Sequence, residues 1–208
     1  MCSRLPNWTS LLFYPYLMPE NSSIERDRIL FEKFCESARK LTTRAEIDFE
    51  EVPAPQRLAP HAVAFSMDVQ INGDDVATGR FVMLHDPTGQ EAWEGKFRAI
   101  TFIRSAIEDD LQSDPLLTDV AWSWVAESLD AVGASYLASS GTVTKVSSAS
   151  YGQLAEADQS SEIEIRASWT PSDAEKLSDH LEAWLRMIET VSGLTPIAEG
   201  VSSLKSRR

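Results

Sequence analysis

Three histidines are the side chains of this sequence best suited to proton transfer near neutral pH. His85 precedes Asp86, and a carboxylate beside an imidazole can orient it as a general base. Neighbouring residues at the end of a strand usually point to opposite faces, however, and Asp86-Pro87-Thr88-Gly89 is typical of a β-turn. The turn therefore explains Asp86 better than catalysis does.

Four acids between residues 108 and 114 could hold Mg²⁺ if their carboxylates converged. A solvated loop before a capped helix explains the same four residues, and no two histidines have metal-ligand spacing, so we predict no metal site. The sequence contains no phosphate-binding glycine motif, no Gly-x-Ser-x-Gly and no Cys-x-x-Cys. We therefore predict no cofactor, and we lean against an enzyme.

The small polar run Ser139-Ser140-Gly141-Thr142 has two interpretations. It could lie against a ligand, or it could form a turn or the start of a strand, which we favour. If the chain is an enzyme or a small-ligand binder, we expect the pocket on the open face of the predicted sheet, near His85, Arg98 and Arg104. A deep pocket with a strongly shifted pKa at His85 or at an acid would favour that alternative.

The overall charge limits the classes of partner. The chain has 19 Lys+Arg against 32 Asp+Glu, a formal net charge of −13. Such a surface repels phosphate backbones and anionic lipid, so we predict no direct nucleic-acid partner and no membrane partner. Residues 105–144 contain seven acids and no Lys or Arg. A basic partner could bind there, although a solvated face is the simpler interpretation.

Cysteine usage and the N-terminal segment bear on the compartment. Cys2 and Cys35 form neither a disulfide framework nor a zinc site, which fits a reducing compartment, so we predict a cytoplasmic protein. The apolar run of residues 11–18 is short and contains Pro15. It is therefore neither a convincing signal peptide nor a membrane span.

The helices and strands that hold these candidate residues can be predicted from the periodicity of apolar residues. Spacings of three and four predict three amphipathic helices, which begin near Ser22, Asp114 and Ser172. Ser22 and Ser172 each start a Ser-x-x-Glu capping box, and Asp114 precedes a first-turn proline. Alternation from Val63 to Ile71, followed by Asn72-Gly73, predicts a tight hairpin. The predicted strands are residues 45–52, 63–71, 76–85, 92–103, 142–148 and 162–169, with a stiff proline-rich connector at 53–60.

Together these elements predict an α+β fold: a mostly antiparallel sheet with three amphipathic helices packed on it, in the order α-β-β-β-β-α-β-β-α. The predicted domain spans residues 21–195. Residues 1–20 form an irregular, aromatic N-terminal arm, which could pack on the domain or on a second subunit, or could reflect a wrongly assigned start codon. Residues 196–208 form a polar tail.

The second predicted helix carries the candidate interaction surface. Trp122 and Trp124 lie about 200° apart around the helix axis. Either one fills the core while the other lies at an interface, or the packing side is wide enough to cover both. Asp119, Glu127 and Asp130 are the acids of its polar face. We predict that these five residues contact a protein partner with a basic or apolar surface, or a second copy in a homodimer.

Several long stretches together resemble an actinobacterial family of uncharacterised proteins, known as domain of unknown function 3000. The stretches are EEVPAPQRLAP (50–60), HDPTGQEAW (85–93), DPLL (114–117) before WSW (122–124), SGTVT (140–144) and IEIRASWTP (163–171). The resemblance covers roughly residues 25–200. It implies a bacterial cytoplasmic protein and supplies no catalytic residue.

The element order is also similar to that of secretion-chaperone-like folds, whose subunits often dimerise and hold other polypeptides. Fold analogy alone does not establish function. We predict a non-enzymatic cytoplasmic protein-binding or scaffolding module with chaperone-like character. The alternative is an enzyme or small-ligand binder whose site no motif marks.

Overall fold

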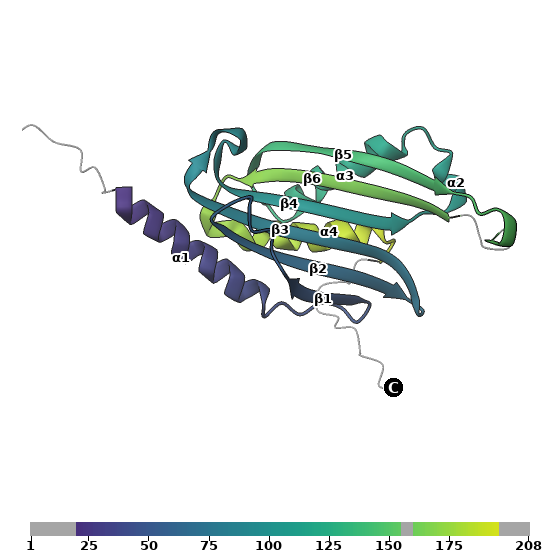
Figure 1. The fold of residues 1–208 in the computed structure, drawn as a ribbon, viewed down its shortest axis with the longest axis horizontal. Coiled ribbons are helices and arrows are strands. Elements are labelled where there is room, and N and C mark those ends of the chain that lie inside the picture. The colour runs from purple at the N-terminus through teal and green to yellow at the C-terminus, as the bar shows by residue number, and fades with distance from the viewer. Residues whose placement is uncertain (1–19, 155–159, 196–208) are drawn as a thin grey trace, which may run out of the picture.

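Successive hairpins build one antiparallel sheet in the computed structural model, which describes residues 20–154 and 160–195 (Figure 1). The six strands follow the order β1-β2-β3-β4-β6-β5. Their bounds are Ile47–Val52 (β1), His61–Ile71 (β2), Asp74–Gln90 (β3), Gly95–Ala106 (β4), Tyr136–Ser148 (β5) and Ser160–Pro171 (β6). The predicted fold class and element order are confirmed.

The helices pack on one face of this sheet. The α-helices are α1 (Glu20–Ala38), α2 (Asp109–Gln112), α3 (Leu117–Ala131) and α4 (Leu177–Val191). Short 3-10 turns are η1 (Glu91–Trp93), η2 (Gly152–Leu154) and η3 (Ala174–Lys176). Figure 1 shows α3 and α4 behind the sheet. None of the helices in the described ranges is long and apolar enough to cross a membrane.

Buried and more exposed side chains alternate along the strands, as the sequence indicates. In β2, Val63, Phe65, Met67 and Val69 are all nearly inaccessible and lie on the helix-covered face. The turn to β3 places Asn72 at φ 56° and Gly73 at φ 97°, the left-handed backbone that a tight hairpin requires.

Gly79 of β3 has no side chain, which allows α4 to pack closely against the centre of the sheet. A Cβ atom at Gly79 of β3 would lie 2.8 Å from Ile188 Cδ1 and 3.0 Å from Trp184 Cζ2. Trp184 is fully buried and its ring centroid lies 5.5 Å from that of Phe81. The large aromatic side chains therefore stabilise the contact between helix and sheet.

The predicted helix starts differ in detail. Helix α1 already includes Ser22, so this serine is not the N-cap. Asp173, not Ser172, caps the turn before α4, because its carboxylate accepts a hydrogen bond from the Glu175 amide at 2.9 Å. Asp114 Oδ1 accepts from the Leu116 amide at 2.8 Å, and α3 begins only at Leu117. Serine and aspartate are both common N-cap residues, and here they are neighbours. The sequence pattern therefore allows either Ser172 or Asp173 to cap the turn, and in the structure Asp173 does so.

The predicted turn at residues 86–89 lies inside β3. Asp86 accepts hydrogen bonds from the Thr88 amide and hydroxyl at 3.0 and 2.7 Å, and from Gln90 Nε2 at 3.1 Å. The pairing with β4 shifts register between His85 and Gln90. These bonds make an irregularity in the strand, and the chain reverses afterwards, around η1 and Glu94. The predicted arm, apart from Glu20, and the predicted tail lie outside the described residues.

Candidate functional site

The face of the sheet opposite the helices is called the open face here. Strand register defines it row by row: Ser66, Arg80, Phe102, Arg166 and Thr142 are successive cross-strand neighbours from β2 to β5. Phe102 is partly exposed, and Arg80, Arg166 and Thr142 are exposed. This face presents its side chains to solvent over much of its area.

The proline-rich connector covers one end of the open face. The Pro53 carbonyl accepts a hydrogen bond from Arg80 Nη2 at 2.9 Å, and the Leu58 carbonyl accepts from Gln90 Nε2 at 3.3 Å. Val82 and Leu84 form a small buried cluster with apolar residues of this connector. The stiff connector is therefore anchored on the sheet.

Beyond the connector lies a hollow of about 660 Å³, called the arginine groove. Its floor is apolar, and its rim carries two arginines and the small polar residues of β5. Its lining includes Arg80, Val82, Ile100, Phe102, Arg166, Ser168 and residues 140–142. The Arg166 guanidinium carbon lies 4.9 Å from the centroid of the Phe102 ring, a cation–π contact.

Arg98 lies below the serine end of this groove and is only 7% exposed. Its Nη1 donates to the Ala138 carbonyl at 2.8 Å and to Thr170 Oγ1 at 3.0 Å. Its Nη2 donates to Ser168 Oγ at 2.7 Å and to Ser140 Oγ at 3.3 Å. All four acceptors are neutral, and burial lowers the pKa of the guanidinium. Within the described ranges, Arg98 forms no salt bridge.

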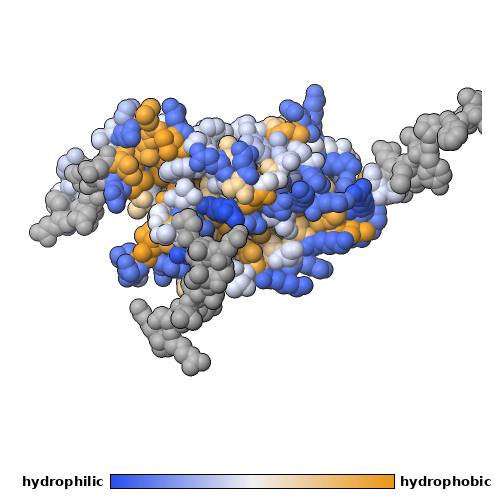
Figure 2. Space-filling model, turned by 180° about the vertical axis from the view of Figure 1, so that it is seen from behind, coloured by the Kyte–Doolittle hydropathy of each residue, from blue (hydrophilic) through white to orange (hydrophobic). Residues whose placement is uncertain are grey.

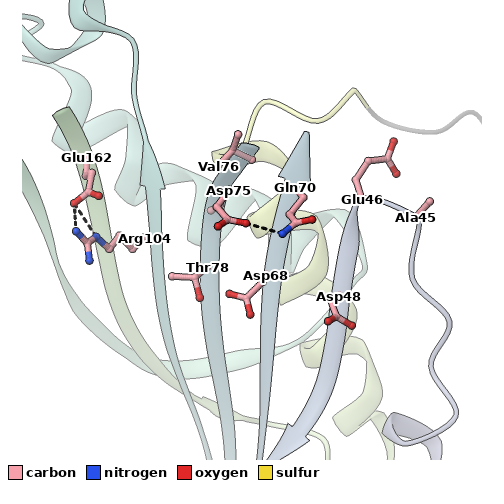
Figure 3. A pocket seen from close by; sticks show the side chains of 11 residues that line it. Ala45, Glu46, Asp48, Asp68, Gln70, Asp75, Val76, Thr78, Arg104 and Glu162 are labelled. Carbon is pink, nitrogen blue, oxygen red and sulfur yellow. Dashed lines mark hydrogen bonds and ion pairs between the residues drawn. The ribbon is translucent and has the colours of Figure 1, made fainter. Parts of the chain in front are cut away.

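A second hollow of about 670 Å³, the acidic corner, lies at the other end of the open face (Figure 3). Its carboxylates come from Glu46, Asp48, Asp68, Asp75 and Glu162. Gln70 Nε2 donates to Asp75 at 2.7 Å, as the dashed line shows. Arg104 also lines this corner, where its Nε donates to Glu162 at 2.7 Å, and this contact raises the pKa of Arg104.

The three residues predicted to share a pocket therefore lie in three places. Arg98 backs the arginine groove, and Arg104 lines the acidic corner. His85 faces the helices, because it pairs with Phe97, the neighbour of Arg98, and neighbours on a strand point to opposite faces. The small polar run predicted either to contact a ligand or to start a strand lies within β5, and residues 140–142 line the arginine groove.

His85 is fully buried among rings. Its centroid lies 4.6 Å from that of Phe97, 5.4 Å from that of His61 and 5.6 Å from that of Phe31. Neither ring nitrogen has a hydrogen-bond partner among the residues that the structure describes. Burial, with a smaller contribution from His61, lowers the pKa of His85 to about 4. The ring is therefore neutral at pH 7 and is separated from the open face by the sheet.

The two tryptophans of α3 lie on either side of its buried stripe. Trp122 packs under β5, where a Cβ at Gly141 would lie 2.6 Å from its Cζ3 atom. Trp124 lines a small hollow of about 170 Å³ beside Arg186 and Glu189, next to α4. Both rings are partly buried against the core, which agrees with a packing side wide enough for both.

The outer surface around α3 combines acids with exposed aliphatic side chains. Asp119, Glu127 and Asp130 are exposed. Leu111, Leu116 and Val120 are 46%, 60% and 45% exposed, and we call these three the α2–α3 patch. Figure 2 shows hydrophobic residues gathered at the upper left, over the end of the molecule that carries α2 and the start of α3.

Sequence reasoning missed the α2–α3 patch and most of the arginine groove. Leu116 and Leu117 are adjacent apolar residues at the start of α3, but Leu117 is buried and Leu116 is 60% exposed. A signal for the groove was present in the alternating strands, because Arg80 and Arg166 occupy polar positions between buried residues. Arg80 and Arg166 lie on either side of Phe102 only because of the register between β3, β4 and β6, which the sequence does not show.

The comparisons with known proteins address the family. A family model described as a protein of unknown function (DUF3000) matches residues 28–202. The searches of curated proteins and of solved structures returned no match. The match confirms the resemblance to this family and assigns no activity. Because it covers most of the sequence, the chain belongs to the DUF3000 family of proteins of unknown function.

Proposed function

We propose that the protein is a non-enzymatic, cytoplasmic binding module that holds a protein partner on the α2–α3 patch. The observation that carries this proposal is the gathering of Leu111, Leu116 and Val120, three of the six large apolar side chains that are exposed in the described part of the chain. Single exposed apolar residues are normal on a protein surface, whereas a contiguous group is typical of an interaction site.

The patch is held in a fixed shape. Lys145 Nζ of β5 donates to the carbonyls of Gln112 and Asp114 at 3.2 and 3.1 Å, which ties the end of α2 to the sheet. The Val120 amide donates to the Leu116 carbonyl at 2.9 Å, so these two side chains lie one helical turn apart. A preformed apolar surface loses little conformational entropy when a partner binds.

Burial of the patch can supply useful binding energy. Complete burial of an aliphatic side chain contributes about 1.5–3 kcal/mol, so three side chains that are about half exposed contribute roughly 2–4 kcal/mol. That amount can anchor a complex when polar contacts surround it.

Charge indicates the chemistry of the partner. The patch adjoins Asp114 and Asp119, and Glu127 and Asp130 follow on α3. Residues 105–144 contain no Lys or Arg, and Lys145, whose ammonium lies against the end of α2, donates to two backbone carbonyls there. Complementary charge speeds association and disfavours partners of like charge. The partner is therefore a protein surface with apolar anchors surrounded by Lys and Arg.

The test uses a defined probe, an amphipathic helical peptide with leucine on one face and lysine on the other. Fluorescence anisotropy should show binding that the double variant Leu116→Ser/Val120→Ser weakens at least about tenfold, because an apolar contact of this size is lost. A scrambled peptide of equal composition should bind more weakly to the unaltered protein.

Leu58→Ser is the matched control, because Leu58 is 49% exposed and lies on the connector, away from α2 and α3. Equal binding by the double variant and the unaltered protein would overturn the proposal. So would a dimer, seen by light scattering, that the double variant dissociates, because the occupant of the patch would then be a second copy.

A further inference from the structure

We infer that the arginine groove is a binding site for a small organic anion, a molecule with a carboxylate or phosphate group on an apolar or aromatic body. The groove lies on the opposite side of the sheet from the helices, so this inference does not depend on the proposed function. The hollow of about 660 Å³ is open to solvent, so its side chains rather than enclosure must hold the ligand.

The floor of the groove suits an apolar body. Phe102 and Ile100 of β4 are partly exposed there, and Val82 of β3 lies beside Ile100 in the strand register. Arg80 and Arg166 flank Phe102 on the two neighbouring strands, about 10 Å apart at the backbone because strands are spaced by about 4.8 Å. Because the Arg166 guanidinium already lies over the Phe102 ring, an apolar body would rest beside it, on Ile100 and Val82.

The serine end of the groove suits the anionic group. Ser140 and Ser168 both accept hydrogen bonds from Arg98, and each hydroxyl keeps its own hydrogen to donate. Their oxygens lie 3.4 Å apart, so one hydroxyl can donate to the other. The second hydrogen is then available to a ligand. A hydroxyl that accepts from a buried cation is a stronger donor than a free one.

Arg98 has no ion-pair partner among the described residues, and Glu94 favours its charge only from beyond ion-pair distance. Burying a cation without a counter-charge costs free energy, and the chain has 32 acids that could have supplied one. Arg104, on the same strand and the same face, is paired with Glu162. An anion at Ser140 and Ser168 would supply the missing counter-charge next to Arg98.

The first measurement compares two probes that share a ring system. Calorimetry should show that 2-naphthoate binds the full chain at least about tenfold more tightly than neutral 2-naphthamide, because a charge-assisted hydrogen bond is stronger than a neutral one. Inorganic phosphate alone should bind more weakly than 2-naphthoate, because it has no apolar body. Equal affinity for acid and amide, or no binding of 2-naphthoate at millimolar concentration, would overturn the inference.

The second measurement locates the site. Arg166→Gln and Ser168→Ala should each weaken 2-naphthoate binding severalfold or more. Arg104→Gln is the matched control: it removes the same charge from the same face, and Arg104, like Arg166, has a glutamate partner. If Arg104→Gln weakens binding as much as Arg166→Gln does, the effect is general electrostatics and the assigned site is wrong. These variants avoid Arg98, whose loss could unfold the protein.

Discussion

The arginine groove and the acidic corner occupy the same face of one sheet and have nearly equal volumes, about 660 and 670 Å³. Strands β3 and β4 contribute to both. In the corner, Arg104 is exposed and paired with Glu162, whereas Arg98, six residues earlier, is buried and bonded to hydroxyls and a carbonyl. Arg104 thus has its charge balanced by a carboxylate, whereas Arg98 is bonded only to neutral oxygens and positions two serine hydroxyls.

The largest expected difference between these two regions is in stability. Arg98→Ala should lower the free energy of unfolding by about 3–5 kcal/mol, because it removes four charge-assisted hydrogen bonds, one of them buried and three partly buried. Arg104→Ala should change the stability much less, because its ion pair is exposed and screened. Urea unfolding followed by tryptophan fluorescence measures both variants. Equal losses would contradict the distinction drawn between the two arginines.

Acid should produce the next largest effect, and it arises on the helix-covered face. The unfolded chain protonates His85 near the ordinary pKa of 6.5, whereas the folded chain resists protonation until about pH 4. The stabilisation from the neutral ring is therefore complete above pH 6.5 and is lost as the pH falls toward 4. A shift of this size corresponds to about 3 kcal/mol.

The check is His85→Phe, which keeps a ring between Phe97 and Phe31 and removes the titrating group. The variant should lose less stability than the unaltered protein between pH 6.5 and pH 4. Some loss should remain, because burial also lowers the pKa of His180 to about 4. Identical pH profiles for the two proteins would show that His85 does not carry this dependence.

The smallest expected effect tests whether an unpaired arginine is sufficient for anion binding. Glu162→Gln releases Arg104 from its carboxylate but leaves Asp48, Asp68 and Asp75 nearby. We expect the affinity for 2-naphthoate to change by less than about twofold, because like charge repels the anion. A clear gain in affinity would show that pairing alone distinguishes the two regions, without the apolar floor and the serine hydroxyls.

The fold class could be predicted from the sequence, because the helical spacing of three and four and the strand alternation of two are both clear in the apolar residues. The sequence was also sufficient for the argument that His85 and Asp86 point apart. The grouping of Arg98 with Ser140 and Ser168 was beyond it, because the partners are 42 and 70 residues away and meet only through the strand order β4-β6-β5. Helical periodicity identifies buried positions such as Leu117, but it does not show which of the other apolar residues, such as Leu111 and Leu116, form a patch on the surface.

The placement of β6 between β4 and β5 has a consequence for how the protein is made. Residues up to Ser148 supply five of the six strands, but β4 and β5 have no hydrogen-bonded neighbour on their facing edges until β6 is synthesised. Long-range pairing of this kind is slow, and unpaired strand edges promote aggregation. A nascent chain that stalls before residue 160 therefore carries two open edges that the complete sheet does not have, and it lacks Ser168.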